Sequence, residues 1–207
     1  MASDRSVIRR WIFLSLSASL LTLGLATAST AAQDRALFAG GCFWCMEEAF
    51  EAVPGVLSVV SGYTGGMRAN PTYEQVSGGR TGHAESIEVV FDPGMVTYDE
   101  LLDVFWHNVD PTSADGQFCD RGTQYRPAIF YHNEQQQRLA EASRQRIQRD
   151  KRFPEALVVE VTPASPFYVA EEHHQDYYKR NPIRYKYYKF ACGRAQRLEE
   201  LWGKKGG

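Results

Sequence analysis

The chain has 207 residues, of which 43% are hydrophobic and 23% are charged, and its formal net charge is −2. This length and apolar content predict one globular domain with a sizeable core and exclude an intrinsically disordered chain. The near-neutral charge argues against a nucleic-acid partner, because neutralising phosphates requires a clear excess of Lys and Arg.

The first 32 residues have the pattern of a secretory signal peptide. Three arginines precede the apolar run Trp11–Ala26, which is too short for a transmembrane span, and small residues follow it. We expect cleavage after Ala28, or alternatively after Ala32, and a single domain over 34–203; a retained membrane anchor is the alternative. The mature, mildly acidic chain is expected to be a periplasmic or secreted monomer without stable membrane association.

The first predicted elements alternate in type. Residues Ala36–Gly40 predict a short strand, Phe43–Val53 an amphipathic helix ended by Pro54-Gly55, and Val56–Tyr63 a second strand. A glycine-rich connection over Gly65–Gly82 follows, which is too long for a connector without a role. We therefore interpret it as a candidate site loop.

The second half continues this mixed order. Ala84–Phe91 predicts a strand, and Thr97 with Glu100 forms a capping box that begins a helix. A second irregular segment covers Asp110–Arg126. The remaining predictions are a strand at Ala128–Tyr131, a helix from the Asn133 cap to Arg149, a last strand at Ala156–Thr162, and helices at Ala170–Arg180 and Arg194–Trp202. This order favours an α+β two-layer sandwich, with helices on a mixed or antiparallel sheet and a ferredoxin-like core, over a doubly wound parallel sheet.

Four cysteines in an exported chain ordinarily predict two disulfides, with three possible pairings. Cys42 suggests another use, because it follows two glycines that connect a predicted strand to a predicted helix. In the first turn of that helix, the helix dipole and unpaired N–H groups would favour its thiolate. Cys42 is therefore a candidate nucleophile, with a buried inert thiol or a disulfide partner as the alternatives.

Glu85 is the second chemical signal. Along the predicted strand it shares a face with Ile87, Val89 and Phe91, so its carboxyl group is expected to face the core. Burial disfavours the charged form and raises the pKa of a carboxyl group, which suits proton donation near neutral pH. The alternative is a glutamate at the strand end that reaches solvent.

Tyrosines and histidines give weaker signals. Tyr73 lies in the glycine-rich connection and Tyr125 lies near Asp120 in the second irregular segment, where their hydroxyl groups could be donors. Adjacent His173 and His174 would point apart on a helix, so no metal site is expected. Five tyrosines interleaved with Lys and Arg are interpreted as a solvated amphipathic face: Tyr177, Tyr178, Tyr185, Tyr187 and Tyr188.

Taken together, these motifs resemble those of the A-type peptide methionine sulfoxide reductases over most of the mature chain. The matching segments are GGCFW (40–44), GYTGG (62–66), NPTYEQV (70–76), TGHAESIEV (81–89), FDP (91–93), DPT (110–112), DRGTQYR (120–126) and HQDYYKRNP (174–182). The resemblance implies an α+β fold and reduction of the S epimer of methionine sulfoxide, free or in proteins, with no cofactor.

The resemblance also implies a role for individual residues. Cys42 would attack the sulfoxide sulfur, while Glu85 protonates the oxygen as the S–O bond breaks. The substrate would be held by Phe43 and Trp44 around the S-methyl group, by Tyr73 and Tyr125 at the oxygen, and by Asp120, which would order the pocket. These roles agree with the chemistry, because hydroxide is a poor leaving group unless it is protonated.

Attack would leave Cys42 as a sulfenic acid, which condenses with a second thiol to a disulfide. The resemblance favours Cys192, in the C-terminal segment, as this resolving thiol, with Cys45 and Cys119 as alternatives. On that assignment Cys192→Ser would block turnover with a thioredoxin-fold reductant but leave one equivalent of reduction. The C-terminal segment departs from the glycine-rich tail of many relatives, because its end is expected to be helical.

Two other functions are consistent with parts of the sequence. A strand that leads into Cys-Phe-Trp-Cys at a helix start is typical of a thioredoxin-like dithiol oxidoreductase, which would use Cys42 and Cys45. That hypothesis gives no role to Glu85, Tyr73 or Tyr125. A non-enzymatic exported module held by two disulfides is the third hypothesis, and the number of free thiols distinguishes it.

Overall fold

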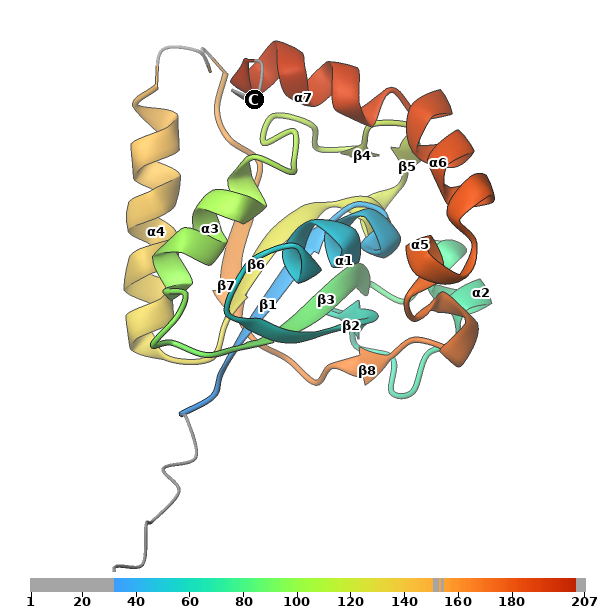
Figure 1. The fold of residues 1–207 in the computed structure, drawn as a ribbon, viewed down its shortest axis with the longest axis horizontal. Helices are drawn as coiled ribbons and strands as arrows, with labels where there is room; N and C mark the ends of the chain where they lie inside the picture. Colours follow the sequence, from blue (N-terminus) through green and yellow to red (C-terminus); the bar gives the residue numbers. More distant parts are fainter. Residues whose placement is uncertain (1–31, 151–152, 154, 204–207) are drawn as a thin grey trace, which may run out of the picture. The chain divides into compact units, whose positions relative to one another are not determined.

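A six-stranded mixed sheet organises residues 32–150, 153 and 155–203, which are the residues described by the computed structural model (Figure 1). The expected signal peptide, residues 1–28, lies outside them. The strands are β1 (Asp34–Gly40), β2 (Val56–Thr64), β3 (Ala84–Phe91), β6 (Pro127–Tyr131), β7 (Glu160–Pro163) and β8 (Tyr168–Val169), and a separate ribbon joins β4 (Gly116–Gln117) and β5 (Asp120–Arg121). The order across the sheet is β7-β6-β1-β3-β2-β8, and only the β6–β7 pair is parallel.

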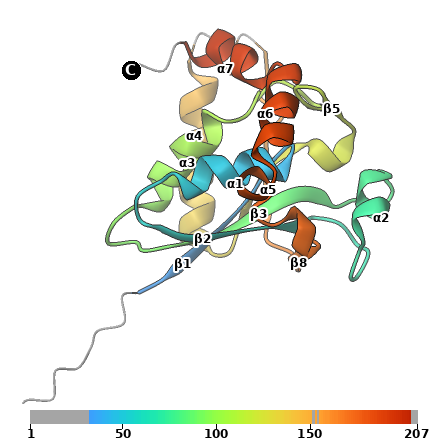
Figure 2. The same cartoon turned by 45° about the vertical axis from the view of Figure 1, so that its right-hand side comes forward.

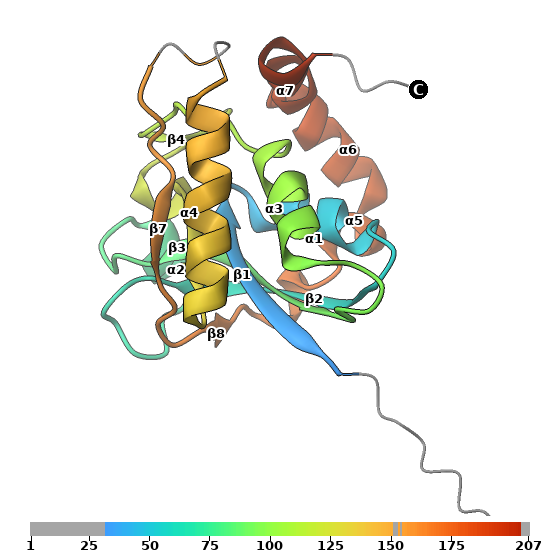
Figure 3. The same cartoon turned by 90° about the vertical axis from the view of Figure 1, so that its left-hand side faces the viewer.

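Helices cover one face of this sheet. They are α1 (Phe43–Glu51), α2 (Tyr73–Ser77), α3 (Tyr98–Trp106), α4 (Glu134–Gln148), α5 (Tyr177–Arg180), α6 (Pro182–Ala191) and α7 (Arg194–Trp202), with 3-10 turns η1 (Thr123–Tyr125) and η2 (Glu172–His174). Helices α1, α3 and α4 lie beside the sheet (Figures 1 and 3). Because side chains alternate along a strand, Phe38 points toward these helices, and its ring stacks on Phe50 at 5.1 Å and on Phe105 at 5.4 Å. On the opposite face Leu37 and Phe130 pack under Phe167. This is the predicted α+β sandwich.

Two helix starts were readable from sequence. At α3 the Thr97 hydroxyl accepts from the Glu100 N–H at 3.2 Å, while Glu100 Oε2 accepts from the Thr97 N–H at 2.7 Å. At α4 the Asn133 side chain accepts from the Gln136 N–H at 2.9 Å. Each cap satisfies donors that a helix end leaves unpaired.

Several predicted elements are wrong at their boundaries. The connection over 65–82 contains α2, and the strand expected at 156–162 pairs with β6 only from Glu160 onward. The helix expected over 170–180 is split into η2 and α5. Gln175 causes the break, because its side chain bonds both the N–H and the carbonyl of Ser61, at 3.0 and 2.9 Å, and so ties the chain to strand β2.

The C-terminal helices α6 and α7 lie near α1 and complete the surroundings of the candidate site (Figure 2). Helix α6 was not predicted, although Pro182 at its first turn is a typical start signal. Across the stretch of chain covered by the structure, no helix combines the length and apolar character needed to cross a membrane.

Candidate active site

Cys42 lies where β1 turns into α1. Gly41 makes this turn with φ of +84°, and a Cβ there would lie 2.5 Å from Cβ of Gln117, so glycine is required. Cys42 is the N-cap residue, not a member of the first turn as predicted, and its carbonyl accepts from the Cys45 N–H at 3.1 Å. Both cysteine side chains are buried free thiols.

The pKa of the Cys42 thiol is shifted in the opposite direction to the one expected from sequence. Burial raises the pKa of the Cys42 thiol well above its usual value, with further increases from Cys45 and Glu85, so desolvation outweighs the helix dipole. The pKa of Cys45 is lowered to about 6, first by a hydrogen bond with Cys42 and then by the charges of Arg194 and Lys189. The directions of the two shifts favour ionisation of the Cys45 thiol over that of the Cys42 thiol.

Glu85 projects from β3 toward the helix layer, as its period-2 position predicts. Its side chain is only 3% exposed, and burial raises its pKa to about 8. The Phe43 N–H donates to Glu85 Oε2 at 3.1 Å, which opposes this rise and fixes the carboxyl group beside the start of α1. At neutral pH the carboxyl group is mostly protonated and can act as a proton donor next to Cys42.

A cavity of about 110 Å³ brings the predicted site residues together. Its lining consists of Cys42, Phe43, Trp44, Tyr73, Glu85, Asp120, Tyr125 and Tyr188. Burial raises the pKa of Tyr73 to about 12 and that of Tyr125 further, with contributions from Glu85 and Asp120 in both cases. Both hydroxyl groups therefore keep their protons as potential donors. At roughly 30 Å³ per water-sized group, the cavity fits the end of one side chain.

Aromatic rings form the apolar part of the wall. Trp44 stacks on Tyr177 at 3.8 Å, and His174 packs against Phe43 at 5.2 Å and Tyr73 at 4.4 Å. Burial lowers the pKa of His174, so the ring is neutral and serves as a flat packing surface.

Tyr188 was missed by sequence reasoning, which placed it on a solvated face. It enters the cavity from α6 and donates a hydrogen bond to Asp120 Oδ2 at 2.6 Å. Tyr185 is also buried and donates to Glu48 Oε2 at 2.6 Å, whereas Tyr187 is 75% exposed. The three-residue spacing of Tyr185 and Tyr188, which places both on one helix face, was the available signal.

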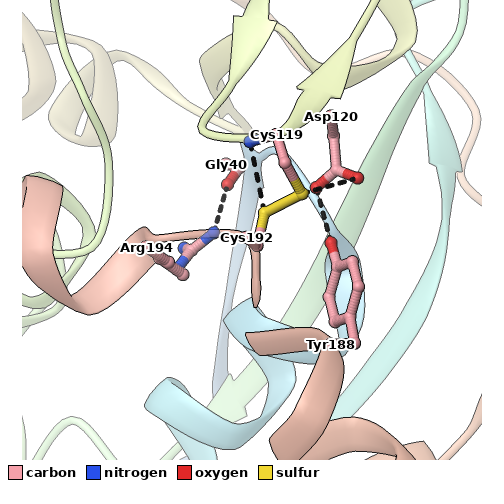
Figure 4. The surroundings of a disulfide bond; sticks show 6 residues. All are labelled: Gly40, Cys119, Asp120, Tyr188, Cys192 and Arg194. Atoms are coloured by element: carbon pink, nitrogen blue, oxygen red, sulfur yellow. Dashed lines mark hydrogen bonds between the residues drawn. A yellow bond between two sulfur atoms is a disulfide. The ribbon is translucent and has the colours of Figure 1, made fainter. Parts of the chain in front are cut away.

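Cys119 and Cys192 form a disulfide (Figure 4). Cys42 and Cys45 are free thiols. The structure therefore has one disulfide in place of the two that four cysteines ordinarily predict, and Cys42 is a free thiol, as its interpretation as a nucleophile requires. The bond connects the residue before Asp120 to the residue one helical turn after Tyr188, and so it links the two partners of that hydrogen bond. Cys192, the favoured resolving residue, is not a free thiol in this state.

A buried thiol beside a protonated carboxyl group, in a small cavity ringed by tyrosines and carried by an α+β sandwich, defines a thiol-dependent oxidoreductase. Residues 34–206 match the family model described as peptide methionine sulfoxide reductase, and the chain belongs to this family. It reduces the S epimer of methionine sulfoxide.

Relatives and solved structures agree with this assignment. "Peptide methionine sulfoxide reductase MsrA" of Bacillus subtilis is 51% identical over 173 residues, which cover 84% of this chain and 98% of the relative. The Listeria innocua protein of the same name is 50% identical over 169 residues, which cover 82% and 96%. The structure of "Methionine sulfoxide reductase A of Corynebacterium diphtheriae" is similar with a TM-score of 0.66 and 33% identity, covering 75% of this chain and 78% of that one. The family assignment replaces both alternatives, the thioredoxin-like oxidoreductase and the non-enzymatic module.

Proposed function

We propose that reduction begins with attack of Cys42 on the sulfoxide sulfur while Glu85 protonates the oxygen. The observation that carries this proposal is the burial of a protonated carboxyl group and a thiol on one cavity wall. Cys42 first passes its proton to the Cys45 thiolate through their shared hydrogen bond. The resulting Cys42 thiolate attacks the substrate sulfur, the substrate S–O bond breaks as Glu85 supplies its proton, and the oxygen passes to Cys42. The products are methionine and the Cys42 sulfenic acid.

The other cavity residues orient the substrate in this proposal. Phe43 and Trp44 contact the S-methyl group, and the hydroxyl groups of Tyr73 and Tyr125 donate to the sulfoxide oxygen. Asp120 orders the pocket by accepting from Tyr188 at 2.6 Å, which adds Tyr188 to the set expected from sequence. Donors already held in a dry cavity stabilise developing charge on oxygen without reorganisation.

We propose Cys45, in place of Cys192, as the thiol that resolves the sulfenic acid. Cys45 is a free thiol hydrogen-bonded to Cys42 and lies within the same turn, whereas Cys192 and Cys119 are bonded to each other. Condensation of Cys42–SOH with Cys45–SH forms the Cys42–Cys45 disulfide and releases water.

Three variants test this scheme with separated S and R epimers of a methionine sulfoxide substrate. Cys42→Ser is expected to consume neither epimer with dithiothreitol. Cys45→Ser is expected to reduce one equivalent of the S epimer and then stop with a thioredoxin-type reductant, while Cys192→Ser continues to turn over. The opposite result, a stop in Cys192→Ser and turnover in Cys45→Ser, would restore Cys192 as the resolving residue.

A thioredoxin-fold dithiol protein is the reductant that we propose for the cycle, with methionine sulfoxide in oxidised proteins or free as the substrate. A yeast protein of the same fold, 22% identical to this chain with a TM-score of 0.51, has been solved "in complex with Trx2". Reduction assays with a purified thioredoxin and its reductase test the partner, and a rate no higher than without the thioredoxin would reject it.

We also propose that the protein is exported to the periplasm or secreted as a monomer. The arginine-flanked apolar run Trp11–Ala26 followed by small residues supports this, as does the disulfide near the surface at the partly or fully exposed Cys119 and Cys192. Mass spectrometry of the protein from a periplasmic fraction is expected to show a chain beginning after Ala28 or Ala32. A full-length N-terminus in the membrane fraction would instead indicate a retained anchor.

A further inference from the structure

A second cavity, of about 570 Å³, is lined by Cys45 but not by Cys42. The sulfoxide cavity has the reverse lining, with Cys42 and not Cys45. The walls of this second space, named here the Cys45 cavity, come from the end of α3, from α6 and from α7; they include His107, Lys189, Arg194, Leu198, Glu199 and Trp202. Its volume is in the range of small-molecule sites, whereas the sulfoxide cavity admits only a side-chain end.

The charged lining of the Cys45 cavity consists of two cations and one carboxylate. Arg194 is buried and is held by the carbonyls of Asn108 at 2.6 Å and Gly40 at 3.5 Å, which are neutral partners and leave its positive charge in place. Lys189 adds a second cation, which also pairs with Glu48, and Glu199 contributes one carboxylate. Both cations lower the pKa of Cys45, which shows that their fields reach its sulfur.

The rest of the lining is apolar. Leu198 and Trp202 contribute side chains from α7, and the Trp202 ring lies 4.6 Å from the ring of His107. A ligand that fits both parts of the wall is small, carries an acidic group for the cations and has a short carbon chain for the aromatic side.

The placement of the two sulfurs matters for disulfide exchange, which depends on which sulfur is attacked and from which side it is reached. An attacking thiolate approaches a disulfide along the line of the S–S bond, opposite the leaving sulfur. In a Cys42–Cys45 disulfide, a thiolate that enters from the Cys45 cavity meets Cys45 and expels Cys42 toward the sulfoxide cavity.

We propose that the Cys45 cavity binds a small anionic thiol as a second reductant beside the thioredoxin-fold protein, and that this thiol attacks Cys45 and releases Cys42 for the next substrate. This inference rests on the proposed Cys42–Cys45 disulfide. The first thiolate forms an RS–S–Cys45 bond and leaves Cys42 as a thiolate. A second thiolate then displaces Cys45 and yields RSSR, so two small thiols are oxidised and one protein disulfide is reduced. Substrate and reductant thus reach the active cysteines from two different cavities.

The test compares two reducing thiols of opposite charge on the protein oxidised with methionine S-sulfoxide. Mercaptoethanesulfonate is expected to regenerate the Cys42 thiol about fivefold faster than cysteamine after correction for thiol pKa, because it is attracted to two cations at partly screened sites. Leu198→Trp fills the cavity. This variant is expected to lower the rate at which mercaptoethanesulfonate regenerates the Cys42 thiol about tenfold, because the reagent can no longer reach Cys45. Gln196→Trp is the matched control, because Gln196 is an exposed α7 residue outside the lining, and its rate should equal wild type. Equal rates in the two tryptophan variants, or no preference between the two thiols, would overturn the proposal.

A second measurement needs no sulfoxide. In a Cys42→Ser background, with the Cys119–Cys192 bond intact, Cys45 is the only free thiol, and its alkylation by iodoacetate reports access through the cavity. Leu198→Trp is expected to slow this alkylation and Gln196→Trp to leave it unchanged, and equal rates would overturn the proposal. The alkylation rates could differ as expected although sulfoxide never produces a Cys42–Cys45 disulfide. That result would reject Cys45 as the resolving thiol but would still support access to Cys45 through the cavity.

Discussion

Replacement of Glu85 by Gln should change the pH dependence of stability in a defined direction. Glu85 has an ordinary pKa of 4.5 and a pKa of about 8 in the folded protein. The folded state therefore holds the proton more tightly than the unfolded state. Protonation of Glu85 contributes most to the free energy of unfolding below pH 4.5, and this contribution is lost as pH rises toward 8. The amide side chain of the Glu85→Gln variant would keep the oxygen that accepts from the Phe43 N–H, but it does not titrate.

The magnitude follows from the shift. Each pH unit between the two pKa values lowers the free energy of unfolding of the wild type by about 1.4 kcal/mol through this group. The free energy of unfolding of Glu85→Gln minus that of wild type should therefore rise by about 3 kcal/mol between pH 5 and pH 7. Urea unfolding of both proteins at pH 5, 6 and 7, with the disulfide intact, measures this difference, and other titrating groups cancel because both proteins contain them. A difference that stays constant across these pH values would show that the folded pKa of Glu85 is not raised.

Three further outcomes are expected. The same Glu85→Gln variant should lose at least about a hundredfold in kcat/KM for the S epimer, and the wild-type rate should fall as pH rises through about 8, since the acid form is then lost; an unchanged alkaline limb in the variant would assign that limb to another group. Tyr73→Phe and Tyr125→Phe should each lower kcat about tenfold, because each removes one donor to the oxygen in the transition state; stopped-flow measurement of the first turnover checks this, and wild-type rates in the double variant would remove both tyrosines from the reaction. Thr97→Ala should lower the free energy of unfolding by about 1 kcal/mol through loss of the α3 cap and leave kcat/KM unchanged; a change in activity would mean that α3 is coupled to the site.

Local signals predicted much of the fold and most of the cavity. The capping box at Thr97 and the alternation around Glu85 depend only on neighbours within the same helix start or strand, and both appear as predicted. The break at Gln175 depends on Ser61, 114 positions away in the sequence, which no local pattern contains. Tyr188 was misplaced for a similar reason, because its burial depends on how α6 packs against α1 and Asp120.

The predicted pKa shift of Cys42 was wrong for a different reason. The position at a helix start was nearly right, but the expected sign of the shift was wrong because burial of the thiol depends on the tertiary surroundings. Sequence reasoning weighed the helix dipole, which is a local effect, without the desolvation that the packed C-terminal helices impose.

The Cys119–Cys192 bond also acts on the unfolded chain. It closes a loop between residues 73 positions apart, and a loop of this length removes enough conformational freedom from the denatured ensemble to stabilise the folded protein by about 4 kcal/mol in the chain-entropy account. Reagents such as dithiothreitol, used to sustain turnover, can also open this loop. Activity measured with such a reagent therefore belongs to a less stable protein than the one that exists under oxidising conditions. A thermal melt with and without the reductant separates the loss of this constraint from the regeneration of the active thiols.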